Sequence, residues 1–112
     1  MEPIDWNALR ENCAGDEGLV SEVLDLFLGE AGAMLTDVEA AVKAGDAVAV
    51  KRSAHRLKGA LVSLAARPST EAARALEVTG ATGALADAPG QYATLATEVQ
   101  RLLQAIRLPR AA

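Results

Sequence analysis

The sequence predicts an all-α fold: an antiparallel four-helix bundle with a short N-terminal helix packed on it. Hydrophobic residues make up 51% of the 112 residues but aromatic residues only 3%, so the core consists mainly of aliphatic residues and alanine, and alanine and leucine are the strongest helix formers. Apolar residues recur at helical spacing, and aspartates and glycines stand where helices begin and end. The length fits a single domain, residues 1–112.

The first helix is predicted to begin at Asp5, which can cap it, with Ile4 and Leu9 at the two positions of a hydrophobic staple. It stops near Gly15, and Asp16 can cap the next helix.

The second predicted stretch covers residues 19–42. Its apolar residues advance in steps of four and three: Val20, Leu24, Phe27, Ala31, Met34, Val38 and Ala41. Gly29 and Gly32 interrupt the middle, so the pattern is compatible with two helices or with one kinked helix. Gly45 ends the stretch, and Asp46 caps a helix over residues 47–65.

The second half is divided by prolines and glycines. Pro68 predicts a break at residues 67–69, followed by a shorter helix over 69–79 and a loop over 80–89. The last predicted helix covers residues 89–108 and ends at Pro109. One face of it carries Tyr92, Leu95, Val99, Leu102 and Ile106.

The helix over residues 47–65 carries the only histidine, His55. At about 100° per residue, its core stripe is Val50, Ala54, Leu57, Leu61 and Leu64. His55 lies about 130° from that stripe, so we expect it to face solvent. Its side of the helix is shared by Lys51, Lys58, Gly59 and Val62.

This arrangement suits an exposed nucleophilic imidazole. Nearby lysines disfavour a second cation, so they favour the neutral ring that can attack, and they can balance the charge of a phosphoryl group. Gly59, one turn away, has no side chain to block a phosphate or a partner. Two alternatives stay open here: an ordinary surface histidine without a role, and a glycine that relieves crowding against a neighbouring helix.

The segment His55-Arg56-Leu57-Lys58-Gly59-Ala60 resembles the signature H-x-L-K-G-[SA] of histidine-containing phosphotransfer (HPt) domains. The resemblance implies an HPt-like helical bundle in which His55 accepts the phosphoryl group through Nε2. It also implies that Lys58 helps to neutralise the phosphate and that Gly59 keeps the histidine accessible.

Other parts of the chain extend the resemblance. Residues 15–17 and 23–27 look like the early HPt helix, residues 44–46 like the turn before the histidine helix, and residues 75–77 like the helix after it. In the stretch 63–66, Ala65 stands where the family often has glycine, which puts the local packing at that helix end in question.

The resemblance implies two partners, the receiver domain of a hybrid histidine kinase and a response regulator. The chain contains no nucleotide-binding motif, so we expect no ATP-dependent kinase activity and no cofactor, and any Mg²⁺ would belong to the receiver. Two other classes of protein are compatible with a helical bundle: a non-catalytic helical adaptor that binds a receiver or kinase domain, and a structural helical module of a larger assembly. The combination of His55, Lys58 and Gly59 counts against both.

The remaining features exclude several function classes. A net charge of −4 and a pI of about 4.9 give no basic footprint for nucleic acid. One histidine and one distant cysteine cannot form a zinc cluster. No signal peptide or membrane-length apolar run is present, so we expect a soluble, cytoplasmic protein that does not bind membranes. We also expect a monomer. The early methionine favours a stand-alone protein, while a domain cut from a longer chain stays open.

A docking patch is expected around His55. Val48 and Val62 lie on its side of the helix, about two turns before it and two turns after it, with Lys51, Arg52 and Lys58 around them. An apolar centre with a basic rim matches a small, transient interface with an acidic receiver.

Overall fold

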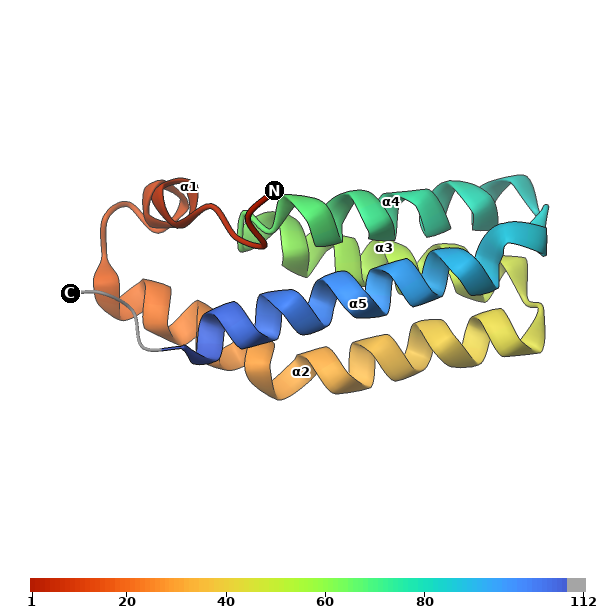
Figure 1. Ribbon diagram of the computed structural model, residues 1–112, viewed down its shortest axis with the longest axis horizontal. Helices are drawn as coiled ribbons and strands as arrows, with labels where there is room; N and C mark the ends of the chain where they lie inside the picture. Colours follow the sequence, from red (N-terminus) through yellow and green to blue (C-terminus); the bar gives the residue numbers. More distant parts are fainter. Residues whose placement is uncertain (109–112) are drawn as a thin grey trace.

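The computed structural model describes residues 1–108 and contains five α-helices and one short 3₁₀ segment in this part of the chain. The helices are α1 (Trp6–Asn12), α2 (Glu17–Ala44), α3 (Ala47–Ser63), α4 (Arg67–Thr82) and α5 (Ala88–Arg107), with η1 (Leu85–Asp87) between the last two. Helices α2 to α5 form an antiparallel bundle in which α2 packs on α3 and α5, and α4 packs on the same two helices (Figure 1). The predicted four-helix bundle with a short N-terminal helix is confirmed.

The predicted caps set the helix starts. Asp5, Asp16 and Asp46 each accept a hydrogen bond from the backbone N–H three residues on, at 3.0 to 3.1 Å. These bonds satisfy donors that the first turn of a helix leaves free. Ile4 and Leu9 are both buried, as the hydrophobic staple predicts. The N–H of Asp5 also donates to the carbonyl of Ala65 at 3.0 Å, which ties the N-terminal segment to the end of α3.

Of the two possibilities left open for α2, the structure has one continuous helix through Gly29 and Gly32, both of which are exposed. The break predicted at residues 67–69 is wrong: α3 ends at Ser63 and α4 begins at Arg67, because a proline is tolerated in the first turn of a helix. The predicted loop over residues 80–89 is shorter than expected, since α4 continues through Gly80 to Thr82 and α5 begins at Ala88. The stop predicted at Pro109 lies outside the described residues. Among residues 1–108, no helix combines the length and the apolar composition that a membrane crossing requires.

The end of α3 forms a Schellman motif with alanine at the position that favours glycine. The N–H of Ala66 donates to the carbonyl of Leu61 at 3.1 Å, and that of Ala65 donates to the carbonyl of Val62 at 3.0 Å. Ala65 itself has φ +57°, a left-handed conformation that costs a residue with a Cβ about 1–2 kcal/mol. The local strain at this helix end is the structural consequence of the alanine noted in the sequence.

Replacing Ala65 with glycine should therefore stabilise the protein. Relief of the left-handed penalty is partly offset by the greater freedom of glycine in the unfolded chain, so we expect a net gain of about 0.5–1 kcal/mol in the free energy of unfolding. Urea denaturation measures this change in the free energy of unfolding. The matched control is Ala33→Gly, on the exposed face of α2, which should lose about 1 kcal/mol. A loss of stability in Ala65→Gly would contradict the strain assignment.

Candidate functional site

The rotation of α3 about its axis places His55 on the surface. The predicted stripe of apolar residues is completely buried, each at 1% exposure or less: Val50, Ala54, Leu57, Leu61 and Leu64. This burial fixes the direction of every other side chain on the helix. The imidazole of His55 is consequently 68% exposed, as predicted.

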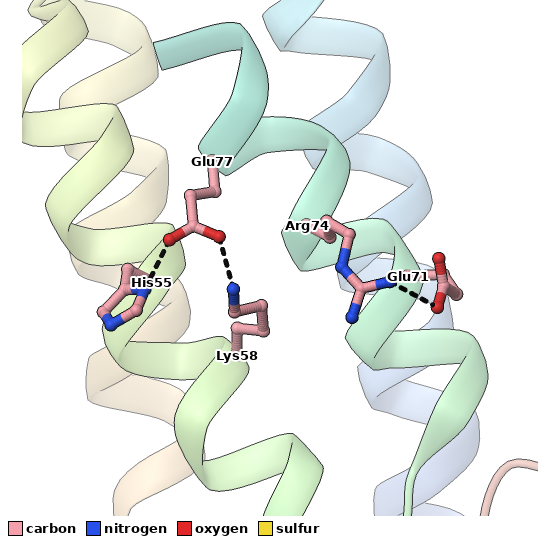
Figure 2. A network of polar contacts seen from close by, with 5 residues as sticks. All are labelled: His55, Lys58, Glu71, Arg74 and Glu77. Carbon is pink, nitrogen blue, oxygen red and sulfur yellow. Dashed lines mark hydrogen bonds and ion pairs between the residues drawn. The ribbon is translucent and has the colours of Figure 1, made fainter. Parts of the chain in front are cut away.

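A carboxylate from the neighbouring helix holds one nitrogen of the ring. Glu77 of α4 contacts Nδ1 of His55 through its Oε2 atom (Figure 2). Its other oxygen, Oε1, accepts a hydrogen bond from Nζ of Lys58 at 2.5 Å. Glu77 thus bridges the two residues that the sequence singled out, and its side chain is only 17% exposed.

The charges around Glu77 keep it ionised. The pKa of its carboxyl group is lowered, first by the hydrogen bond from Lys58 and also by the hydrogen bond from His55, against the opposing effect of burial. An ionised carboxylate has no proton to donate, so in this contact Nδ1 carries the proton. The lone pair of the neutral ring then lies on Nε2. Figure 2 shows this second nitrogen pointing away from both Glu77 and Lys58.

A close backbone contact between α4 and α3 lies one helical turn from the contact between Glu77 and His55. A Cβ atom on Gly80 would lie 2.5 Å from the backbone nitrogen of Lys51 and 2.8 Å from the carbonyl oxygen of Ala47. Only glycine allows this backbone-to-backbone contact. Because Gly80 follows Glu77 by one turn and Lys51 precedes His55 by one turn, the same contact sets how closely Glu77 approaches the ring.

The other predicted residues lie on the same face of α3. Val48 and Val62 are 59% and 52% exposed, and Lys51 and Arg52 are also exposed. Gly59 is exposed, and a Cβ added to it would meet nothing within 4 Å. Crowding against a neighbouring helix is therefore not the reason for glycine at this position.

Sequence reasoning missed the roles of Glu77 and Gly80. Glu77 stands out in the sequence only as part of a family-like stretch, because nothing in the local pattern says which α4 side chain reaches His55, 22 residues earlier. The sequence predicts a loop at Gly80. The signal for its role is a glycine one turn after an acidic residue, on the helix that packs on the histidine helix.

Comparisons with known proteins identify the family and the fold. The model of the Hpt domain family matches residues 22–105. The crystal structure of histidine-containing phosphotransfer protein B (HptB) from Pseudomonas aeruginosa PAO1 is similar, with a TM-score of 0.87 and 25% sequence identity. That match covers 94% of this chain and 91% of the other. No curated protein sequence matches this chain.

Proposed function

This chain belongs to the Hpt domain family, and from that premise we propose that His55 is the phosphoryl carrier of a multistep phosphorelay. Its Nε2 atom accepts the phosphoryl group from an aspartyl phosphate on the receiver domain of a hybrid histidine kinase. It then passes the group to a response regulator. The proposal includes the cytoplasmic location and the monomeric state expected from the sequence.

The observation that carries the proposal is the orientation of the ring. Nδ1 is occupied by the carboxylate of Glu77, while Nε2 points to solvent on a highly exposed side chain. A nucleophile whose other nitrogen is held by a carboxylate has a fixed tautomer and orientation. This is the arrangement needed to attack a group presented by another protein.

The proposed transfer step balances without an added proton. The lone pair on Nε2 forms the N–P bond while the acyl phosphate O–P bond breaks, and the electron pair of that bond leaves with the aspartate carboxylate of the receiver. Nδ1 keeps its proton. The positive charge that develops on the ring faces the ionised Glu77, which stabilises it. The return step reverses these changes on the aspartate of the second receiver.

Lys58 and Gly59 keep their predicted roles within the proposal. Lys58 supplies positive charge to the site, and the structure places its ammonium group on Glu77. Gly59 leaves open space one turn after His55, where a larger side chain would obstruct an incoming receiver.

The distribution of charge supports docking on this face of α3. The protein carries a net charge of −4, yet three exposed cations of α3 form no ion pair with any residue in the described range: Lys51, Arg52 and Arg56. A local basic surface on an acidic protein attracts an acidic partner and orients it. Receiver domains are acidic around the phosphorylated aspartate, by what the family implies.

The two exposed valines of α3 provide a test of docking. Val62→Asp should weaken receiver binding about tenfold and slow transfer, because it places a charge in the apolar part of a small interface. Val48→Asp should act in the same direction with a smaller effect. Titration with a receiver domain measures the affinity, and circular dichroism checks that the helices remain.

The control is Val78→Asp on α4, at an equally exposed position (55%) outside the histidine helix. It should leave affinity unchanged. Normal affinity in both α3 variants would move the docking surface elsewhere.

The decisive experiment for the proposed function is a phosphotransfer profile. The purified protein is mixed with each phosphorylated receiver of its source organism, and label is followed onto the protein and then onto unphosphorylated regulators. A histidine carrier takes up the label and passes it on. The alternative class, a non-catalytic helical adaptor, binds receivers without taking up label, so binding with no transfer to any receiver would reject the proposal.

A further inference from the structure

Delivery of the phosphoryl group depends on the second nitrogen of the ring. Under the proposed function, the N–P bond breaks during delivery and its electron pair returns to Nε2 of His55. If Nδ1 carries a proton, the ring leaves as neutral imidazole. If Nδ1 has lost its proton, the ring must leave as an imidazolate anion, a much stronger base and a poorer leaving group. The protonation of Nδ1 in the phosphorylated protein therefore decides how readily the group is passed on.

One carboxylate is in position to hold this proton. Oε2 of Glu77 contacts Nδ1 of His55, and the side chain of Glu77 is only 17% exposed, so solvent screens the contact less than it would on an open surface. The pKa of Glu77 is lowered, first by the hydrogen bond from Lys58, so the carboxylate is charged and favours a proton on Nδ1. Glu71 and Arg74, the charged residues that precede it on α4, pair with each other (Figure 2).

The remaining charged groups around the ring act against this proton or do not contact the ring. Three cations of α3 lie within about 60° of His55 around the helix and disfavour a further positive charge: Lys51, Arg52 and Lys58. On α2, Glu30 and Asp37 line grooves along α3, but neither bonds to His55 in the part of the chain described. Glu77 is thus the one anion that contacts the ring among residues 1–108.

A phosphoryl group on Nε2 would compete with Glu77 for Lys58. Nζ of Lys58 lies 2.5 Å from Oε1 of Glu77 in the unphosphorylated protein. The role of Lys58 within the proposed function takes its ammonium group to the phosphoryl oxygens, and its flexible four-carbon stem allows that movement. The proton on Nδ1 then becomes the main cationic partner left to Glu77, which strengthens the hold of the carboxylate on the ring.

We propose that Glu77 keeps Nδ1 of phosphorylated His55 protonated, and that this contact sets the pH range over which the protein can give up its phosphoryl group. Glu77 is a positioning residue, because it acts on the phosphoryl group through the ring. A neutral acceptor such as an amide oxygen would hold the same tautomer but would not stabilise the positive charge. The inference rests on the proposed function, since it assumes that Nε2 is phosphorylated.

The experiment phosphorylates the full chain with phosphoramidate, a small donor that needs no docking surface, and follows hydrolysis of the label against pH. In hydrolysis, water takes the phosphoryl group, the N–P bond breaks onto Nε2 and inorganic phosphate is released, so no group of a receiver titrates. Glu77→Gln removes the charge and keeps the size and an accepting oxygen. The control Glu71→Gln makes the same change at an exposed carboxylate of α4 that pairs with Arg74.

In the wild type, hydrolysis should slow as the pH rises through the protonation midpoint of Nδ1. In Glu77→Gln we expect this midpoint to lie about one pH unit lower, because an adjacent opposite charge favours the charged ring. Between the two midpoints the label should survive up to about tenfold longer in the variant. At low pH, where both rings are protonated, hydrolysis should be no slower than in the wild type. Glu71→Gln should follow the wild type.

A second measurement uses the wild type alone. ¹⁵N chemical shifts report the protonation of Nδ1 directly in the phosphorylated protein, folded in buffer and unfolded in urea. We expect the folded protein to keep the proton to a pH about one unit higher than the unfolded chain, in which Glu77 is no longer beside the ring.

The same midpoint in the wild type and Glu77→Gln would overturn the inference, and so would a midpoint no higher in the folded protein than in urea. An equal shift in Glu71→Gln would also overturn it, because the effect would then belong to the overall charge of α4. Failure of the proposed function is separate: phosphoramidate would label His55 and the midpoints would differ as expected, but no receiver would pass label to the protein.

Discussion

Replacing His55 with glutamine should reduce phosphotransfer to background. His55 is the only histidine of the chain, and the nitrogen lone pair of its ring has no counterpart in an amide. Because the ring is 68% exposed, the free energy of unfolding should change by no more than about 0.5 kcal/mol. Uptake of label from a phosphorylated receiver measures the first expectation, and urea denaturation measures the second.

The chemistry of the label provides a further check on the same residue. A phosphoryl group on imidazole nitrogen is a phosphoramidate, labile to acid and fairly stable to alkali, unlike an aspartyl or seryl phosphate. Label on the wild-type protein should disappear in acid. Labelling of His55→Gln at the wild-type level would show that another residue is the acceptor.

Replacing Gly80 with alanine should destabilise the bundle more than any other single-methyl change considered above. The added Cβ would meet the backbone of α3 at 2.5 to 2.9 Å, at Lys51 and Ala47, and backbone atoms cannot move aside as a flexible side chain does. Overpacking costs about 1–3 kcal/mol or more, partly offset by the better helix propensity of alanine, so we expect a net loss of about 2 kcal/mol. The melting temperature should fall by about 10 °C.

The matched control is Gly29→Ala, within α2, where an added Cβ would meet nothing within 4 Å. It should gain about 1 kcal/mol from helix propensity alone. Thermal melts of the two variants compare the same added methyl group at a position that contacts a neighbouring helix and at a position that does not. Equal behaviour of the two variants would show that the contact at Gly80 relaxes freely. Separation of α4 from α3 should also weaken the hold of Glu77 on His55, which ¹⁵N shifts of the ring report.

The features that could be predicted from the sequence depend on local or periodic signals. Asp5, Asp16 and Asp46 cap helices through bonds three residues away, and such bonds are visible in a short window. The stripe of α3 fixed the exposed position of His55 by periodicity alone. Both kinds of prediction held because they require no knowledge of the neighbouring helix.

The features that were missed depend on how two helices meet. A glycine in sequence is compatible with a turn or with a close helix contact, and only the position of Lys51 beside Gly80 distinguishes them. The pairing of Glu77 with His55 depends on the relative rotation and register of α3 and α4, which are set by many buried side chains together. The signature motif could locate the proposed phosphoacceptor, His55, but not the carboxylate of Glu77 that contacts it.

The exposed Nε2 of His55 has a kinetic consequence for the relay. Under the proposed function, a single nitrogen on one face of one helix can react with only one receiver at a time, so the donor and acceptor receivers should bind in turn. The carrier should then operate by a double-displacement, ping-pong scheme. The overall rate of phosphotransfer then depends on how quickly each receiver dissociates. An excess of unphosphorylated donor receiver should competitively inhibit transfer to the acceptor receiver.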